Sequence, residues 1–165
     1  MGRFVDAAGR RTGRQRPRGE TRFVPPGDGL RVLVVDDELL VGRAVAHAAE
    51  ACGCTASLAI SAQSFCAEYE REVPDVVLLD LSLPGGDGVA LLRLLAERES
   101  KALILIVSGF DARVVEAAMR LGVALGLRMG GCLTKPVTVR QLAEALAAAP
   151  GVAAAYGGGH ELCHG

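Results

Sequence analysis

From residue 30 onward, short apolar runs alternate with longer segments that place apolar residues at helical spacing. The runs are β-branched or leucine-rich and are typical of buried parallel strands. They predict strands at 31–35, 54–59, 75–80, 102–107 and around 132–134. The other segments predict helices at 38–51, 61–72, 87–98, 111–126 and 138–148. This order predicts an α/β domain over 30–149, a doubly wound (βα)5 fold with a five-stranded parallel sheet and helices on both faces.

The two ends of the chain lack this pattern. Residues 1–29 carry seven Arg against three acidic residues, together with Gly and Pro, and we expect a disordered basic arm. Two interpretations stay open: the arm is an electrostatic tether to nucleic acid or an acidic partner, or it is a solvated leader or the product of a wrongly assigned translation start. Residues 150–165 are rich in Gly and are expected to form a flexible tail.

Charge and cysteine usage narrow the class of protein. Residues 30–165 carry eleven basic and sixteen acidic residues, so binding to nucleic acid is not expected. The five cysteines form no Cys-x-x-Cys pair, and the N-terminus lacks the apolar segment of a signal peptide. The best apolar run, ALILIV, is too short to cross a bilayer. We therefore expect a soluble, cytoplasmic protein with reduced cysteines and no membrane insertion.

Polar side chains follow the strong strands at the points where these strands end. Asp36 and Asp37 follow the first strand, Asp80 ends the third, Ser108 follows the fourth and Lys135 follows the fifth. The carboxyl ends of parallel strands meet at one edge of a sheet, and in open α/β sheets that edge holds the binding site. We therefore expect these side chains to converge.

The residue types at this edge favour phosphoryl chemistry. Clustered carboxylates repel one another unless a cation is present, and Mg²⁺ prefers such oxygen ligands. A carboxylate beside Mg²⁺ is a possible nucleophile toward phosphorus, which would give an aspartyl phosphate. An ammonium group and a hydroxyl group would then neutralise and bind the phosphoryl oxygens.

Four segments, in this order along the chain, carry a family resemblance: LVVDDE, LLDLSLPGGDG, VSG and LTKPV. Together they resemble the CheY-like receiver domain of two-component response regulators, over about residues 30–149. The resemblance implies a flavodoxin-like sheet with strand order 2-1-3-4-5. It implies that Asp80 is the phosphoacceptor and also a metal ligand. Asp37 and the backbone carbonyl of Ser82 match direct ligands of Mg²⁺, and Asp36 matches an acidic residue that acts through a bound water molecule.

Further positions take their roles from the same resemblance. Ser108 matches the hydroxyl residue that binds the phosphoryl group and moves on activation, and Lys135 matches the lysine that contacts this group. The bond from Lys135 to Pro136 is commonly cis in the family. Gly109 matches the small residue that leaves the acyl phosphate accessible. A turn that supports the phosphorylation loop is expected at Pro84, Gly85, Gly86 and Gly88.

Two features depart from the family pattern. Cys132 stands where the family often has an aromatic switch residue, and we interpret it as a core side chain rather than a redox sensor. The segment from Ser108 to Lys135 is longer than usual by roughly one helical turn or more, and we assign the extra residues near 121–131 to a longer fourth helix or its exit loop. This variant resembles receivers attached to EAL phosphodiesterase domains. Asp87 is interpreted as the N-cap of the third helix.

Because this sequence contains no DNA-binding or enzymatic domain, we expect a stand-alone regulator or a phosphorelay intermediate, unless the chain is a fragment of a larger regulator. A histidine kinase or a histidine phosphotransfer protein would phosphorylate Asp80 in an Mg²⁺-dependent reaction. The output would pass to a downstream protein through the surface of the fourth helix, fifth strand and fifth helix. Such a domain is regulatory and catalyses only its own phosphorylation and dephosphorylation.

Two alternatives of other classes stay open. The absent aromatic switch residue is compatible with a phosphorylation-independent receiver that acts as a protein-interaction module. The tail sequence from His160 to His164 matches the His-Glu-x-x-His motif of zinc proteases, which indicates a zinc hydrolase or a metal-binding tail. Zinc hydrolysis needs a buried helix and a third ligand, which a Gly-rich chain end does not provide.

Overall fold

The computed structural model describes residues 29–84, 87–109 and 111–148. Within them the strands are β1 (Arg31–Val35), β2 (Thr55–Ala59), β3 (Val76–Asp80), β4 (Leu103–Ser108) and β5 (Arg128–Thr134). The helices are α1 (Leu39–Ala51), α2 (Ala62–Arg71), α3 (Asp87–Glu97), α4 (Ala112–Ala124) and α5 (Val139–Ala148). The expected basic arm, the Gly-rich tail with its His160–His164 motif, and Gly85 and Gly86 lie outside the described residues.

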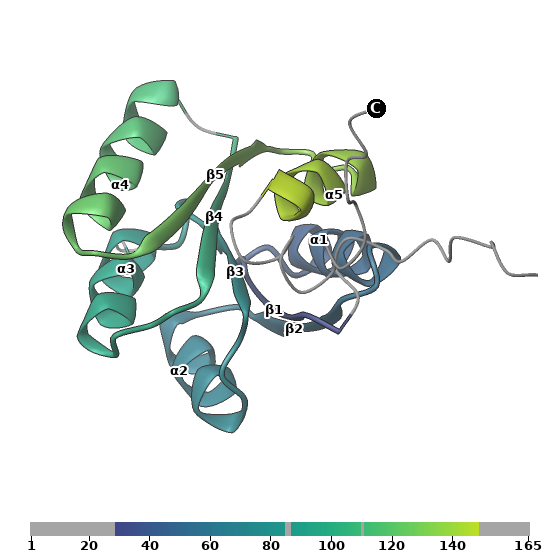
Figure 1. Ribbon diagram of the computed structural model, residues 1–165, viewed down its shortest axis with the longest axis horizontal. Coiled ribbons are helices and arrows are strands. Elements are labelled where there is room, and N and C mark those ends of the chain that lie inside the picture. Colours follow the sequence, from purple (N-terminus) through teal and green to yellow (C-terminus); the bar gives the residue numbers. More distant parts are fainter. Residues whose placement is uncertain (1–28, 85–86, 110, 149–165) are drawn as a thin grey trace, which may run out of the picture.

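The strands form a parallel sheet in the order β2-β1-β3-β4-β5, which confirms the predicted fold and strand order (Figure 1). The register aligns the strand ends: Val35 pairs with Leu79, Asp80 with Val107, and Ser108 with Thr134. The residues that follow β1, β3, β4 and β5 therefore emerge at one edge, as the sequence predicts.

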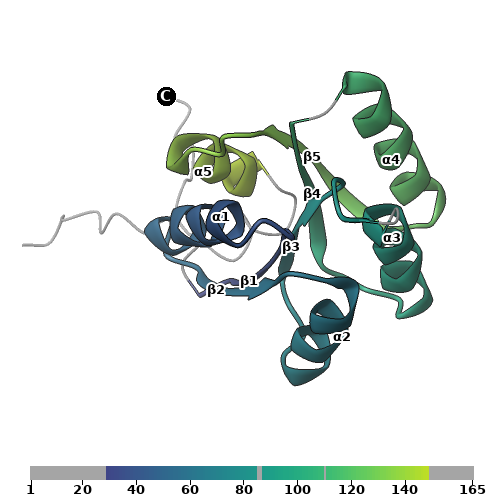
Figure 2. The ribbon, with the colours of Figure 1, turned by 180° about the vertical axis from the view of Figure 1, so that it is seen from behind.

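Helices cover both faces of the sheet. Helices α1 and α5 pack on one face, and α2, α3 and α4 pack on the other (Figures 1 and 2). Successive residues of a strand point to opposite faces. In β1, Val32 and Val34 belong to the core under α1 and α5, while Leu33 and Val35 belong to the core under the other three helices. Strand β3, in the centre, is buried along its whole length, so Asp80 ends a strand with no access to solvent.

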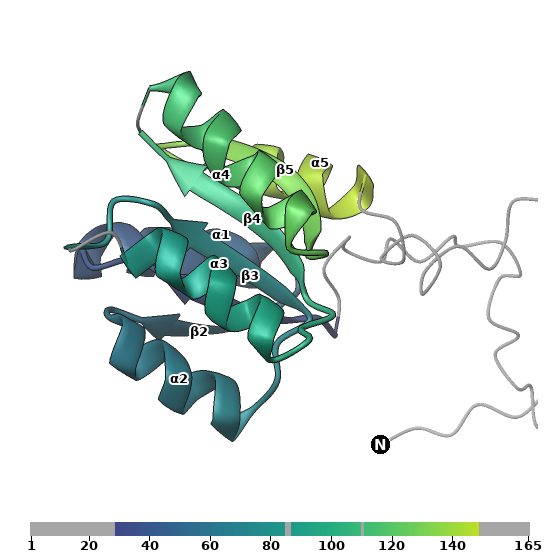
Figure 3. The same cartoon turned by 90° about the vertical axis from the view of Figure 1, so that its left-hand side faces the viewer.

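Local sequence signals set several helix ends. Ser61 and Ser64 form a capping box at the start of α2, and Asp111 accepts a hydrogen bond from the backbone of Arg113 at the start of α4. The expected end of α1 at Cys52 and Gly53 is confirmed, since Gly53 has a φ of +90°, which glycine adopts at little cost. Figure 3 shows α2, α3 and α4 in front of the sheet.

The extra residues expected near 121–131 lie partly in α4 and its exit, as predicted, and partly in β5, which begins at Arg128. Helix α4 ends at Ala124, and the residues from Arg128 onward belong to β5 rather than to the helix or its exit loop. The register against β4 shifts between Ile104 and Leu105, so the glycine pair at 130–131 is accommodated as a bulge. The side chain of Met129 packs against Gly122 of α4, and this contact joins the first part of the strand to the helix.

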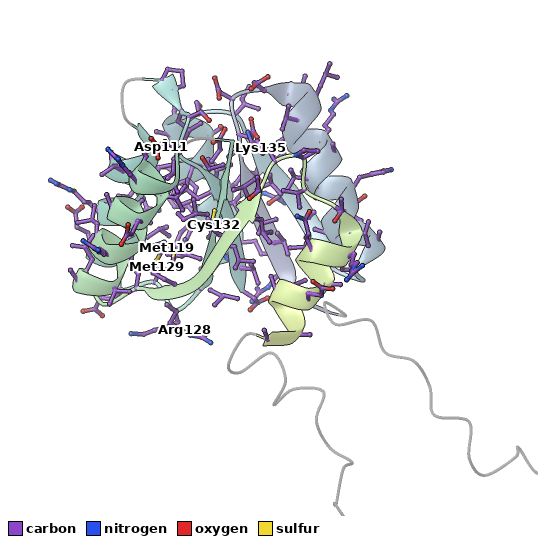
Figure 4. All side chains as sticks on the ribbon, turned by 90° about the horizontal axis from the view of Figure 1, so that it is seen from above. Asp111, Met119, Arg128, Met129, Cys132 and Lys135 are labelled. Atoms are coloured by element: carbon purple, nitrogen blue, oxygen red, sulfur yellow. The ribbon has the colours of Figure 1, made fainter. Side chains whose placement is uncertain are left out.

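Cys132 is exposed, so its interpretation as a core side chain is also wrong. Strand β5 is at the edge of the sheet, and alternate side chains of an edge strand face away from the main core. The next residue, Leu133, is buried. Figure 4 shows Cys132 in the middle of β5, with Arg128 and Lys135 toward its two ends.

Candidate functional site

Three carboxylates meet at the carboxyl ends of β1 and β3. Asp36 and Asp80 are 1% and 0% exposed, and Asp37 is exposed. Each of the three offers one carboxylate oxygen, and these oxygens lie within 4.8 Å of one another. The backbone N–H of Asp36 donates to the carbonyl of Ala59 at the end of β2. The structure therefore brings together the acidic residues that the sequence predicts to converge.

Lys135 contacts two of these carboxylates. Its Nζ donates to Oδ2 of Asp36 and to Oδ2 of Asp80, both at 2.7 Å. Burial opposes the charge on Lys135 and is the largest single effect on its pKa, but the hydrogen bonds and charges of Asp36 and Asp80 together outweigh it and raise that pKa. The ammonium group is therefore charged at neutral pH and acts as the counter-ion of the two buried carboxylates.

The second oxygen of each buried carboxylate also has a partner. Oδ1 of Asp36 accepts a hydrogen bond from the backbone N–H of Glu38 at 2.9 Å. Oδ1 of Asp80 accepts two hydrogen bonds from Ser82, at 2.8 Å from the backbone N–H and at 2.6 Å from the hydroxyl group. The family resemblance gives a role only to the carbonyl of Ser82, so the hydrogen bond from its hydroxyl group was not predicted. A Ser two residues after an Asp is a signal for such a local turn, in which the carboxylate accepts from the backbone two residues on.

Ser108 and Lys135 are joined through the backbone. Ser108 ends β4 and is 3% exposed, and its carbonyl accepts a hydrogen bond from the N–H of Lys135 at 3.1 Å. The Lys135–Pro136 peptide bond is cis, as the family resemblance implies. Gly109, the next residue after Ser108, is exposed, and a Cβ placed on it would meet no atom within 4 Å. The structure thus leaves open space where the sequence predicts that a small residue gives access to the site.

The chain after Asp80 passes close to the start of α3. A Cβ on Gly88 would lie 2.9 Å from Cα of Leu81 and 3.0 Å from the carbonyl oxygen of Asp80, so only glycine fits there without a backbone shift. The predicted turn residue Pro84 is exposed, between Leu83 and the start of α3. Helix α3 begins at Asp87, whose side chain is outside the described part of the chain.

The donor set of this site fits a hard divalent cation. Three carboxylates and one ammonium group leave a local charge of −2, since among the described residues only Lys135 forms an ion pair with this cluster. The candidate ligands are all oxygen atoms, which Mg²⁺ prefers to nitrogen or sulfur. A dication would neutralise the excess negative charge.

Comparison with known proteins identifies the family of this chain. The family model described as the response regulator receiver domain matches residues 32–147. Sensory transduction protein RegX3 of Mycolicibacterium smegmatis is 34% identical over 111 residues, which cover 67% of this chain and 46% of RegX3. A protein-glutamate methylesterase/protein-glutamine glutaminase of Nitrobacter winogradskyi is 29% identical over 118 residues, which cover 70% of this chain and 27% of that protein. The chain thus spans about a quarter to a half of these curated relatives.

Solved structures of response regulators and chemotaxis proteins share the fold of this chain. The crystal structure of a response regulator from Colwellia psychrerythraea is 29% identical, with a TM-score of 0.59, over 71% of this chain and 93% of that one. Chemotaxis protein CheY4 of Vibrio cholerae has a TM-score of 0.63 at 21% identity, over 73% of this chain and 98% of that one. None of the described helices is long and apolar enough to cross a membrane.

Receiver domains are regulatory phosphoacceptor domains of two-component signalling. They take phosphoryl groups from histidine kinases or phosphotransfer proteins, and they bind Mg²⁺ through an acidic pocket of the kind formed by Asp36, Asp37 and Asp80. The likeness to receivers attached to EAL domains stays a prediction. The family match over 32–147, the strand order and the acidic cluster agree, and the chain belongs to the response regulator receiver domain family.

Proposed function

We propose that Asp80 of this chain accepts a phosphoryl group from a histidine kinase or a histidine phosphotransfer protein. The observation that carries the proposal is the environment of the Asp80 carboxylate. It is buried at the carboxyl edge of the sheet, with Lys135 on one oxygen and Ser82 on the other. A carboxylate fixed in this way presents its oxygen in one orientation to an incoming phosphorus atom.

Mg²⁺ would be held by Asp37, Asp80 and the backbone carbonyl of Ser82, with Asp36 acting through a water molecule. When bound, the ion supplies positive charge that offsets the negative charge of the phosphoryl oxygens. Lys135 and the hydroxyl group of Ser108 would bind those oxygens directly. These roles are supported by the oxygen-only donor set and by the burial of Ser108 beside the strand of Asp80.

The reaction forms one bond and breaks one. An oxygen of Asp80 attacks phosphorus, and the bond from phosphorus to the donor's imidazole nitrogen breaks, with its electron pair left on that nitrogen. In dephosphorylation, water attacks phosphorus and the Asp80 carboxylate leaves, which gives inorganic phosphate. The domain would catalyse only these two reactions on itself and is not proposed to turn over any other substrate.

Phosphorylation would act by shifting the balance between two conformations. Ser108 and Lys135 would move toward the phosphoryl group. Ser108 pairs with Thr134 at the end of β5, and its carbonyl accepts a hydrogen bond from the N–H of Lys135, so their movement would reach β5. The surface of α4, β5 and α5 would then bind a downstream protein with altered affinity. We take residues 30–149 as this receiver, flanked by 1–29 and 150–165, and we place it in the cytoplasm, where histidine kinases act.

Intact-mass measurement after incubation with acetyl phosphate and Mg²⁺ tests the proposal. We expect wild type to gain one phosphoryl group and Asp80→Asn to gain none. Asp111→Asn is the matched control, because Asp111 is an exposed acidic residue at the start of α4 and should not affect labelling. Folded wild type without any mass gain, or equal gain in Asp80→Asn, contradicts the proposal. The first of these results would favour the phosphorylation-independent interaction module.

A further inference from the structure

The two oxygens of the Asp80 carboxylate have different partners. Two donors approach Oδ1, the N–H and the O–H of Ser82, and Lys135 donates to Oδ2. Each carboxylate oxygen has two lone-pair positions in the carboxylate plane. The two hydrogen bonds from Ser82 therefore equal the number of lone-pair positions that Oδ1 offers.

The charge on Lys135 makes Oδ1 the better oxygen for a metal ion. A dication at Oδ2 would be repelled by the ammonium group, whose Nζ lies 2.7 Å from that oxygen. No such positive charge contacts Oδ1 among the described residues. The oxygen that is electrostatically favourable for a cation is thus the one that Ser82 already occupies.

Only one of the two hydrogen bonds from Ser82 is easily released. The backbone N–H is fixed by the turn, but the hydroxyl group leaves Oδ1 by a rotation of the side chain about χ1. Ser82 is half-buried, so a rotated hydroxyl group has access to water. At 2.6 Å, the bond from the hydroxyl group is the shorter of the two, and hydrogen bonds to charged groups are the stronger kind.

We propose that the hydroxyl group of Ser82 competes with Mg²⁺ for Oδ1 of Asp80. It stabilises the cation-free site and must rotate away before the ion binds there, so it lowers the affinity of the site for the ion. Ser82 is then a positioning residue that sets the Mg²⁺ concentration at which Asp80 becomes reactive. This inference rests on the proposed function of Asp80.

Isothermal titration calorimetry with MgCl₂ tests the competition without any phosphodonor. Ser82→Ala removes the hydroxyl group and keeps the backbone N–H, and we expect its Kd for Mg²⁺ to fall by about three- to tenfold, the net loss of one hydrogen bond whose donor can bond to water after it rotates. Ser82→Thr restores a hydroxyl group and should return the Kd toward the wild-type value. Ser64→Ala is the matched control, because Ser64 is in the capping box of α2.

Thermal denaturation separates this role from a purely structural one. Without Mg²⁺, Ser82→Ala should melt below wild type, and at saturating Mg²⁺ the difference should shrink. A Kd in Ser82→Ala that equals or exceeds the wild-type Kd overturns the inference, as does the absence of Mg²⁺ binding in both proteins. Labelling of Asp80 is read separately by mass, so labelled wild type with an unchanged Kd in Ser82→Ala rejects the competition and leaves the proposed function intact.

Discussion

The two ends of the sheet each carry a cluster of charged side chains, and the clusters differ in burial. At the amino ends of the strands, Arg31 donates from Nε and Nη2 to the two carboxylate oxygens of Asp75, at 3.0 and 3.1 Å, and Glu72 lies 3.8 Å from Nη1. The side chains of Arg31 and Asp75 are 44% and 37% exposed. At the carboxyl ends, the Lys135 side chain is 16% exposed and contacts two carboxylates that are almost completely buried.

The clusters also differ in what their charges do. Arg31 starts β1 and Asp75 directly precedes β3, so the exposed pair joins two neighbouring strands in register, and water screens its charges. At the other end, two buried carboxylates share one ammonium group, and the exposed carboxylate of Asp37 lies beside them. In the exposed cluster, the positive charge of Arg31 is paired with both carboxylate oxygens of Asp75. The buried cluster keeps an excess of negative charge, which costs stability and gives affinity for a cation.

The strongest test of this difference is to remove the basic side chain from each cluster, Lys135 from one and Arg31 from the other. Without divalent cations, Lys135→Met is expected to lower the free energy of unfolding by about 3 kcal/mol, because it leaves two buried carboxylates without their counter-ion. Arg31→Met also removes one positive charge, but its pair is exposed, and the loss should be several times smaller. Urea denaturation of both variants in EDTA measures the two losses.

Equal losses in the two variants would contradict the comparison. Lys135→Arg, which keeps the charge, controls for the removal of the side chain itself. If the loss in Lys135→Met comes from unpaired carboxylates, a second substitution, Asp36→Asn, should recover part of it. If the double variant is less stable than Lys135→Met alone, packing rather than charge explains the loss.

Removal of one acidic residue from each cluster should change stability in opposite directions. Asp37→Asn takes away a negative charge from an excess of negative charge and is expected to raise the free energy of unfolding by about 0.5 kcal/mol in EDTA. Asp75→Asn takes away the partner of Arg31 and is expected to lower it by less than about 1 kcal/mol. Urea denaturation at neutral pH distinguishes the signs. Destabilisation by both substitutions would show that the cluster at the carboxyl ends carries no net repulsion.

The sequence predicted the edge of the sheet better than the details of the site. Apolar runs that stop abruptly at Asp36, Asp80 and Ser108 predict both the strands and the convergence of these residues, since parallel strands leave no other arrangement of their carboxyl ends. The role of the Ser82 hydroxyl group was not predicted, because its hydrogen bond to Asp80 depends on the rotamer of a side chain in a turn.

The fifth strand shows where the pattern of apolar residues fails. The residues from Arg128 to Gly131 include two glycines and no β-branched side chain, so they do not resemble a strand. Pairing with β4 and the contact of Met129 with Gly122 outweigh this weak local preference. Cys132 was assigned to the core from residue type alone, and its exposure follows from the place of β5 at the edge of the sheet, which only the tertiary structure shows.

The smallest expected effect is on the pH dependence of stability, which should differ between the clusters. The hydrogen bond from Arg31 lowers the pKa of Asp75 against the opposing effect of partial burial, so the stability from this pair is present above the unfolded pKa of about 4 and is lost as pH falls through the folded value. The raised pKa of Lys135 has the opposite consequence: its contribution is present below the unfolded pKa of about 10.4 and is lost as pH rises through the folded value. Urea denaturation between about pH 2 and 7 measures the free energy of unfolding of wild type and of Arg31→Met. The difference between the two values should shrink below about pH 4. A difference that stays constant over this range would mean that Arg31 stabilises the fold through the packing of its side chain, and not through the charge of Asp75.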